Sequence, residues 1–308
     1  MRRRQAQEVR MTLEVRVAES DADLEAFIRI RRALLPNESG GTVELMRADL
    51  SANPDRRYYV AEVDGEVVGS GLVSLSDLGD RFSLKVRVLP HARRRGVGTA
   101  LLRKLVTHAT GDKISGHVEE EGSRPFAERF GFRESDRQVE QVKRLGDELQ
   151  PPSLPEGIDV VSCAERPELL RQAYPLAAEG YYDMALERPA QISLDNWLRD
   201  HAALLPGGSF AALADGEIVG FSSLVDHDNP GVAEDGLTVV RGDWRRRGLA
   251  TTLKRMELAW AAENGFREVV TWTQRANEGM RRINELLGYE YRDVSITMVA
   301  PLPLRGLE

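Results

Sequence analysis

The sequence has few of the residues that make disulfides and metal sites. Cys163 is its only cysteine, which excludes an intrachain disulfide and a cysteine-based metal site. The five histidines do not have the spacing of a metal-binding motif; they are His91, His108, His117, His201 and His227. We therefore expect no metal cofactor.

Long apolar runs and an excess of positive charge are also missing. No apolar run is long enough to span a bilayer, and no apolar stretch follows the basic residues 1–11 as it would in a signal peptide. The net charge of −7 argues against a nucleic-acid partner. We therefore expect a cytoplasmic protein, and a hydrophobic content of 42% with 30% charged residues suits globular domains.

An internal repeat organises the chain. The apolar runs YYVAEVDGEVVGSGLV at 58–73 and SFAALADGEIVGFSSLV at 209–225 are both interrupted by Asp-Gly, a strong β-hairpin signal. An Arg-Arg-Arg-Gly sequence follows each hairpin, beginning at Arg93 and at Arg245, and a glycine with an aromatic residue closes each half. Matched features in the same order indicate a duplicated domain.

The two halves are joined by GDELQPPSLPEG at 146–157, whose prolines and glycines are typical of a linker. We expect an N-terminal domain over 12–145 and a C-terminal domain over 158–303. In each half a helix precedes the hairpin, and a strand, a glycine-rich turn and further helices and strands follow it. This order predicts an α+β fold with two tandem domains, each a mixed, largely antiparallel sheet flanked by helices.

The glycine-rich turns are candidate anion sites. Arg93 to Gly98 and Arg245 to Ala250 each lie between a predicted strand and a predicted helix. Glycine lets backbone amides approach a ligand, the helix N-terminus favours an anion, and arginines add phosphate contacts, so a pyrophosphate is the expected guest. Plain turns without a ligand are the alternative. A dinucleotide fingerprint is excluded because several strands precede each turn, and a nucleotide phosphate loop because Gly-Lys-Ser/Thr is absent.

These residues resemble the GNAT acetyltransferase superfamily over nearly the whole chain, twice. In that family the loop binds the pyrophosphate of acetyl-CoA, and the preceding strand pairs with the pantetheine arm. The resemblance implies a C-terminal coenzyme site at Thr238, Val239, Val240, Arg245, Arg246, Arg247, Gly248, Leu249 and Ala250. The matching N-terminal residues are Val86, Arg87, Val88, Arg93, Arg94, Arg95, Gly96, Val97 and Gly98. Asn277 falls where the family often has an asparagine that contacts coenzyme A, and a helix N-cap is the alternative.

The resemblance also implies acetyl-CoA as co-substrate and direct transfer to a primary amine. An alkylamine has a pKa of about 10, so a nearby base assists its attack at neutral pH. The family often places a carboxylate at the strand before the turn, where this sequence has Glu234 and Asp235; solvated loop acids are the alternative. The first half has no acid there, and Glu119 on the next strand is its nearest substitute. The C-terminal half is therefore expected to be catalytic and the N-terminal half a degenerate copy.

The family's usual acid is less well matched. Many members have a tyrosine four residues before the final glycine, where this sequence has Ala127 and Asn284. Tyr289 or Tyr291 could replace it, although Tyr289 suits a core position better. By resemblance, the amides of Val239 and Val240 would be the oxyanion donors.

The acceptor is the least determined feature of the sequence. The residues at 181–183, Tyr-Tyr-Asp, fall where substrate-binding helices lie in the family, and surface packing is the alternative. We expect a small-molecule amine and a monomer or homodimer. The other hypotheses are a protein or antibiotic acetyltransferase and a non-catalytic CoA-binding sensor or scaffold.

Overall fold

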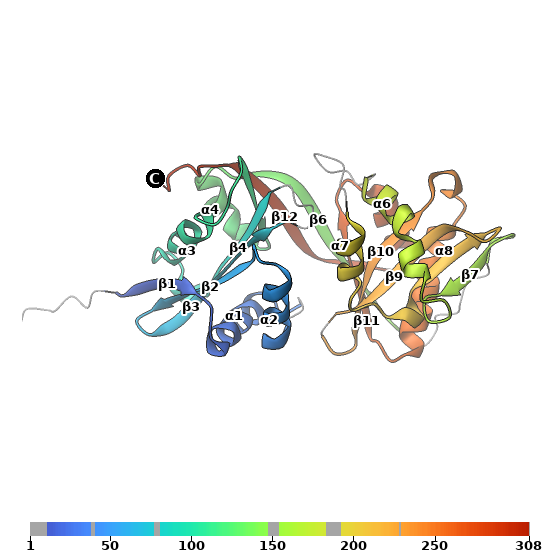
Figure 1. The fold of residues 1–308 in the computed structure, drawn as a ribbon, viewed down its shortest axis with the longest axis horizontal. Helices are drawn as coiled ribbons and strands as arrows, with labels where there is room; N and C mark the ends of the chain where they lie inside the picture. The colour runs from blue at the N-terminus through green and yellow to red at the C-terminus, as the bar shows by residue number, and fades with distance from the viewer. Residues whose placement is uncertain are drawn as a thin grey trace, which may run out of the picture. The chain divides into compact units, whose positions relative to one another are not determined.

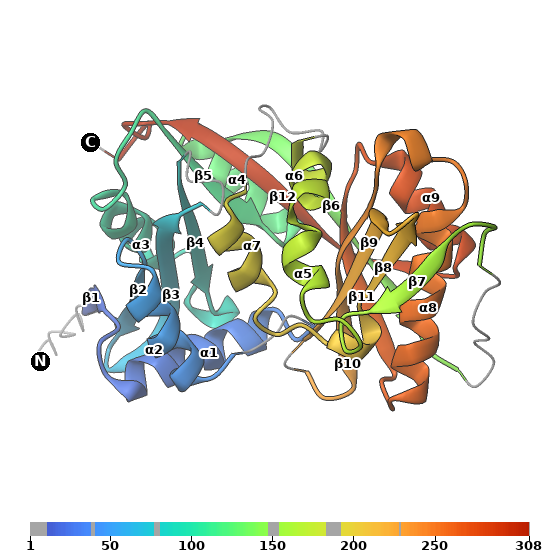
Figure 2. The same cartoon turned by 45° about the vertical axis from the view of Figure 1, so that its right-hand side comes forward.

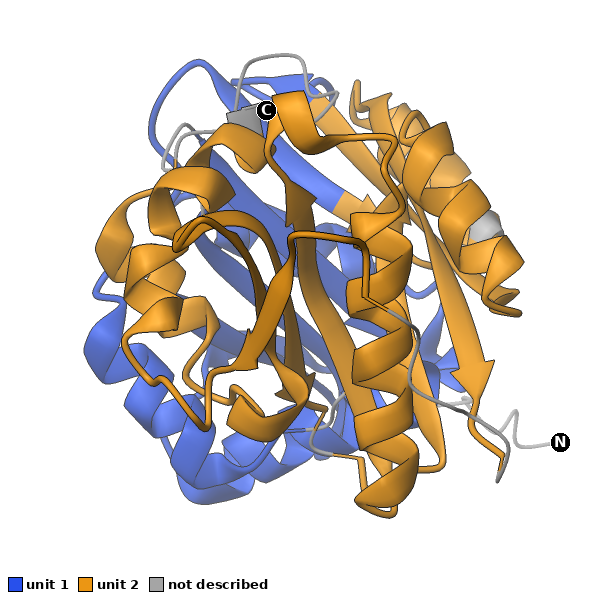
Figure 3. Ribbon diagram, turned by 90° about the vertical axis from the view of Figure 1, so that its right-hand side faces the viewer, with its two compact units in different colours: residues 1–116, 300–308 blue, residues 117–299 orange. Residues whose placement is uncertain are grey.

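The computed structural model describes residues 11–37, 41–76, 81–146, 154–182, 192–227 and 229–307, with Glu121 and Tyr182 described by their backbone only. Most of the predicted linker at 146–157 lies outside these residues, as does Asp183. The chain forms two compact units, coloured separately in Figure 3. Unit 1 comprises Met1–Gly116 and Ala300–Glu308, and unit 2 comprises His117–Val299.

Unit 1 contains a sheet in the order β1-β2-β3-β4-β5, antiparallel except for the parallel pair β4–β5 (Figure 1). Its elements are β1 (Leu13–Val17), α1 (Asp21–Leu34), α2 (Val43–Ala52), β2 (Arg57–Val63), β3 (Glu66–Leu75), β4 (Phe82–Val88), η1 (Pro90–Ala92), α3 (Val97–Val106) and most of β5 (Lys113–Val118). Helix α1 begins with a capping box, in which Ser20 and Asp23 each accept from the other's backbone N–H. Its apolar face, including Leu24 and Phe27, packs on Tyr58 of β2.

Unit 2 contains a sheet in the order β12-β6-β11-β10-β9-β8-β7, in which only the pair β10–β11 is parallel. Its first elements are η2 (Glu121–Ser123), α4 (Arg124–Arg129), β6 (Arg133–Arg144), β7 (Asp159–Ser162), α5 (Leu169–Gln172), α6 (Tyr174–Tyr182), α7 (Leu194–Asp200) and η3 (Pro206–Gly208). The remaining ones are β8 (Phe210–Ala214), β9 (Glu217–Asp226), β10 (Val232–Val240), η4 (Gly242–Trp244), α8 (Leu249–Glu263), β11 (Glu268–Gln274), α9 (Glu278–Leu286) and β12 (Glu290–Pro301). Because each unit combines mixed, largely antiparallel strands with helices, the α+β prediction is confirmed.

Strand β6 belongs by sequence to the first repeat but lies in the sheet of unit 2. Its Val142 is paired with Val270 of β11 on one side and with Glu290 of β12 on the other. Residues 117–145 and 158–299 belong to one compact unit. The compact units therefore divide the chain after Gly116, whereas the sequence repeat divides it at 146–157. The boundary at 146–157 stays a prediction about the sequence repeat.

The two Asp-Gly hairpins form as predicted. Asp64 and Gly65 have φ of 52° and 89°, and Asp215 and Gly216 have φ of 50° and 82°. Positive φ at both central residues is the type I′ turn, whose twist matches that of the flanking strands. The turns therefore set the register of β2–β3 and β8–β9.

Helices cover both faces of the strands β8–β10, as Figure 2 shows with α5 and α6 on one side and α8 on the other. On the first face, Trp197 of α7 packs with Phe221, Leu237 and Val239. On the second face, Leu249 and Leu253 of α8 pack with Val219 and Val240. Strand β10 is thus fixed from both sides. Among the described residues, no helix has both the length and the apolar character needed to cross a membrane.

Candidate functional site

The parallel strands β10 and β11 separate part of the way along unit 2. Their register ends at Glu234↔Val270, although β10 continues to Val240 and β11 to Gln274. Strands β4 and β5 of unit 1 also separate after a short paired stretch. Beyond the last pair, the facing strand edges can hydrogen-bond an extended ligand through main-chain groups.

A β-bulge interrupts β10 at the point where the two strands separate. The register with β9 shifts between Asp235 and Leu237, so that Gly236 is the extra residue. The backbone N–H of Leu237 donates to the Ser223 side-chain oxygen of β9, with a nitrogen–oxygen distance of 3.1 Å. Strand β4 pairs with β3 without such a shift. Bulges redirect strand groups and are frequent beside active sites, so the two units differ at the strand before the turn.

The amides after the bulge alternate between the two edges of β10. The N–H of Arg241 donates to the carbonyl oxygen of Val219 at 2.9 Å, and successive strand amides point in opposite directions. The N–H of Val239 therefore points toward β9, whereas those of Thr238 and Val240 point toward the open edge. Of the two amides expected as oxyanion donors, only that of Val240 faces the separation.

The two predicted carboxylates lie on strand β10 and not in a solvated loop. Asp235 is buried, with a side chain 3% exposed, and forms an ion pair with Lys254 of α8, whose side chain is 1% exposed. Thr238 also donates to the Asp235 carboxylate at 3.3 Å. Because strand side chains alternate, half-buried Glu234 lies on the opposite face, the one that α5–α7 cover. The Asp235 carboxylate therefore pairs with Lys254 on the α8 face of β10, and the Glu234 carboxylate lies on the face that α5–α7 cover.

Two further ionisable groups surround this buried pair. Burial lowers the pKa of Lys254 and raises that of Glu257, one turn further along α8. The Lys254 ammonium nitrogen lies 5.2 Å from the ring centroid of Tyr289, and burial raises the pKa of Tyr289 well above its ordinary value. The places of Asp235, Lys254 and Glu257 are taken in unit 1 by leucines, which are Leu84, Leu102 and Leu105. The charged cluster is thus specific to the copy with the bulge.

The two glycine-rich turns have the same backbone conformation. Arg246 and Gly248 have φ of 63° and 85°, and Arg94 and Gly96 have φ of 64° and 84°. Gly248 caps α8 without a side-chain hydrogen bond, and a Cβ built on it meets nothing within 4 Å. The first amides of α8 have no acceptor within the helix and lie at the positive end of its dipole, as an anion site requires.

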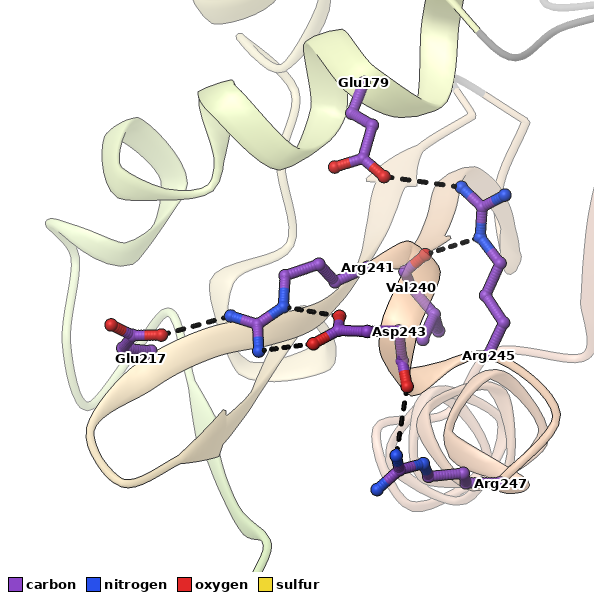
Figure 4. Close-up of polar contacts among 7 residues, drawn as sticks. All are labelled: Glu179, Glu217, Val240, Arg241, Asp243, Arg245 and Arg247. Atoms are coloured by element: carbon purple, nitrogen blue, oxygen red, sulfur yellow. Dashed lines mark hydrogen bonds and ion pairs between the residues drawn. The ribbon is translucent and has the colours of Figure 1, made fainter.

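Two arginines of the second turn, Arg245 and Arg247, contact the end of β10, helix α6 and the turn itself (Figure 4). Arg245 donates through Nε to the Val240 carbonyl at 3.0 Å, and its guanidinium lies 3.7 Å from the Glu179 carboxylate. Arg247 donates to the Asp243 carbonyl at 3.1 Å. These contacts hold the turn in shape, while the predicted phosphate contacts stay predictions.

The first turn repeats one of these contacts. Arg93 donates through Nε to the Val88 carbonyl at 3.1 Å, as Arg245 does to Val240. Arg87, in the middle of β4, is buried. The predicted strand residues of the N-terminal site therefore lie on β4 and its loop residues at the start of α3, in the same local frame as in unit 2.

Asn277 is the N-cap of α9, because its side-chain oxygen accepts from the N–H of Met280 at 3.2 Å. This confirms the helix-cap alternative, and its contact with coenzyme A stays a prediction. Asn284, at the position of the family's tyrosine, is fully buried. Its amide donates to Gln141 Oε1 at 2.9 Å and lies 3.4 Å from Thr273 Oγ1.

The two candidate tyrosines differ in their surroundings. Tyr289 is a buried core residue, as its place in the closing glycine–aromatic sequence suggested. Tyr291 is 51% exposed and donates to the Glu285 carboxylate at 2.6 Å. The contacts of Tyr289 and Tyr291 within the described part of the chain do not place either hydroxyl group at the separation between β10 and β11.

The model of the acetyltransferase (GNAT) family matches residues 24–132 and 170–289, which together make up most of the chain. The protein therefore belongs to the GNAT family and carries two GNAT regions in tandem, and it is an acyltransferase. The resemblance to tandem GNAT acetyltransferases is confirmed.

Among its relatives are two mycothiol acetyltransferases. That of Saccharomonospora viridis is 28% identical and covers 73% of this chain and 78% of its own length. That of Nocardia farcinica is 27% identical and covers 79% of this chain and 82% of its own length.

Two solved structures share the fold. The GCN5-related N-acetyltransferase of Sphaerobacter thermophilus matches with a TM-score of 0.74 at 20% identity, over 94% of this chain and 95% of that one. A tandem GNAT protein from the clavulanic acid biosynthesis pathway matches with a TM-score of 0.73 at 21% identity, over 95% of this chain and 98% of that one.

Proposed function

We propose that unit 2 transfers an acetyl group from acetyl-CoA directly to the primary amine of a small molecule. The observation that carries this proposal is the β-bulge of β10, which lies where β10 and β11 separate and has no equivalent in β4. Family membership supports the acetyl donor, and the relatives' name supports a small-molecule acceptor.

In this proposal the first amides of α8 bind the pyrophosphate of the donor. The open edge of β10 then hydrogen-bonds the pantetheine arm, and the N–H groups of Thr238 and Val240 lie where the acyl carbonyl arrives. Main-chain donors placed in advance stabilise the oxyanion without reorganising during the reaction.

Glu234 is the proposed general base. It lies on β10 next to the bulge and is not held by the Lys254 pair, which engages Asp235 on the opposite face. Glu234 takes the proton of the ammonium, the neutral nitrogen forms a bond to the acyl carbon, and the carbon–sulfur bond breaks. The nitrogen then loses its surplus proton to solvent as the amide forms. Coenzyme A leaves as a thiolate, which is tolerable for a thiol whose pKa lies near 8.5. This accounts for a buried Asn284 in place of a tyrosine acid.

The test measures thiol release from acetyl-CoA over an amine panel that begins with the acceptor of the mycothiol acetyltransferases. Glu234→Gln should lower kcat by about 10²–10⁴, the usual contribution of a general base, while the Kd for coenzyme A is unchanged. Exposed Glu263, on α8, provides the matched control Glu263→Gln, which should keep its activity. Full activity of Glu234→Gln would overturn the base assignment.

Two results would change the wider proposal. Binding of acetyl-CoA without turnover of any amine would favour a sensor or scaffold. Turnover of protein amines alone would move the acceptor to a different class. The coenzyme site of unit 1, at Val86–Val88 and Arg93–Gly98, is proposed to bind without catalysis, because β4 has no bulge and no carboxylate at the matching place.

A further inference from the structure

A buried histidine and a buried serine lie beside the bulge of β10. His201, directly after α7, has Nδ1 2.9 Å from the Trp197 carbonyl oxygen and Nε2 3.0 Å from the Ser223 side-chain oxygen. The same serine oxygen accepts from the backbone N–H of Leu237 at 3.1 Å. A continuous chain of hydrogen bonds therefore leads from α7 to the bulge.

The groups at the two ends of this series of hydrogen bonds determine which of its atoms carry protons. The Trp197 carbonyl can only accept, so Nδ1 of His201 carries a proton. The N–H of Leu237 can only donate, so Ser223 uses one lone pair for it and directs its own O–H to Nε2 of His201. Every donor then has an acceptor with a neutral imidazole, and burial favours this state by lowering the pKa of His201.

Unit 1 shows what the strand does without this serine. The register of β3–β4 and β9–β10 places Leu72 at the position of Ser223, and Leu72 is paired directly with Lys85 in a regular ladder. A leucine side chain has no acceptor for a displaced strand amide. The copy with the serine has the bulge, and the copy with the leucine has none.

We propose that His201 and Ser223 are positioning residues that hold the bulge of β10, so that the N–H groups of Thr238 and Val240 face the acyl carbonyl of the donor. This inference rests on the proposed acetyl transfer. The Ser223 side chain accepts from the Leu237 amide in place of a strand carbonyl, and His201 fixes the orientation of the Ser223 hydroxyl.

We expect Ser223→Ala to weaken the contacts with the acyl group and to leave the contacts with the rest of coenzyme A unchanged. Ser223→Ala removes the acceptor of the Leu237 amide, and the strand relaxes toward the regular pairing seen in β4. Losing one oxyanion donor costs about 10²–10³ in kcat, so a misplaced donor should cost about 10- to 100-fold. The pyrophosphate contacts at the start of α8 are remote from Ser223, so the Kd for coenzyme A should stay the same.

A matched control exists in the same sheet. Ser209 is also fully buried, accepts from a strand amide, that of Leu224, at 3.1 Å, and donates to the Leu205 carbonyl at 2.9 Å. Ser209→Ala thus removes a serine of the same kind that does not touch the bulge. A purely structural loss should affect both variants alike.

The experiment compares the full-length wild type with Ser223→Ala, His201→Gln and Ser209→Ala. Calorimetry gives the Kd values for coenzyme A and for acetyl-CoA without any acceptor, and kcat and KM are measured with an amine that the wild type acetylates. We expect Ser223→Ala to lose the preference for acetyl-CoA over coenzyme A and to lose kcat at similar KM. His201→Gln, whose amide can still accept from Ser223, should lose less, and Ser209→Ala should keep both.

Failure of the inference and failure of the proposed function give different results. A wild type that binds neither coenzyme A nor acetyl-CoA would overturn both. A wild type that binds both, with Ser223→Ala behaving like Ser209→Ala, would overturn this inference alone. If Ser223→Ala does not fold, His201→Phe decides, because its ring cannot accept from Ser223, so wild-type kcat and ligand preference in that variant would exclude a positioning role.

Discussion

The ion pair between Asp235 and Lys254 makes a sharp prediction about the stability of unit 2. Both side chains are almost completely buried, at 3% and 1% exposure, so neither charge has water as a substitute partner. Replacing one partner leaves the other as an uncompensated charge in the interior, which typically costs about 3–5 kcal/mol. We therefore expect Lys254→Met to lose about this much free energy of unfolding, and Asp235→Asn to lose less, because Glu257 still interacts with the Lys254 ammonium.

The double variant should behave in the opposite way. Asp235→Leu with Lys254→Leu copies the apolar pair Leu84 and Leu102 that unit 1 already packs at these places. Replacing a whole buried ion pair by apolar residues is often neutral, or stabilising by about 1–4 kcal/mol. Glu257 remains, and its raised pKa lets it stay protonated when the ammonium is gone.

Tryptophan fluorescence during urea unfolding is the assay. The four tryptophans, Trp197, Trp244, Trp260 and Trp272, all belong to unit 2, so the signal reports this unit alone. Asp243→Asn, which breaks an exposed ion pair with Arg241, is the control and should leave the midpoint nearly unchanged. If Lys254→Met unfolds at the wild-type urea concentration, or if the double variant is as unstable as the single ones, the reasoning is refuted.

Two further predictions concern the turn and the buried glutamate. Gly248→Asp places a carboxylate at the predicted anion site and should abolish coenzyme A binding, measured by calorimetry. The control is Gly265→Asp, because Gly265 has a similar φ of 82° and an equally open Cβ direction, and it should leave binding unchanged. Equal binding by the two variants would contradict the anion site. Glu257 has a pKa raised above its ordinary 4.5 by burial, so the folded state holds a proton that the unfolded state releases, and wild-type stability should fall as pH rises from about 4.5 through the raised pKa. Glu257→Gln should lack this decline in urea unfolding across pH, and parallel curves for the two proteins would contradict it.

Local signals in the sequence predicted local structure well. The Asp-Gly pairs became type I′ turns because few other dipeptides accept positive φ at both positions. The place of β6 could not be predicted in this way. A strand of half-buried residues fits many neighbours, and its pairing with β11 and β12 is decided by contacts far apart in sequence.

The candidate site was predictable in position but not in detail. Glu234 and Asp235 are adjacent in sequence, yet strand alternation places them on opposite faces, and Asp235 forms an ion pair with Lys254. Lys254 and Glu257 were missed, although a signal was present in the repeat. They interrupt the buried side of α8 where the aligned helix of unit 1 has Leu102 and Leu105.

The two repeats differ in the side chains that pack at the strand before the turn. Both copies build the same hairpin, turn and helix, so the fold does not require the polar groups that unit 2 has at four of these positions. Buried polar and charged groups cost free energy unless they are paired. At four matched positions unit 1 has the leucines Leu72, Leu84, Leu102 and Leu105, whereas unit 2 has Ser223, Asp235, Lys254 and Glu257. These polar groups flank β10 from both faces at the bulge, where the acyl group is held in the proposed reaction.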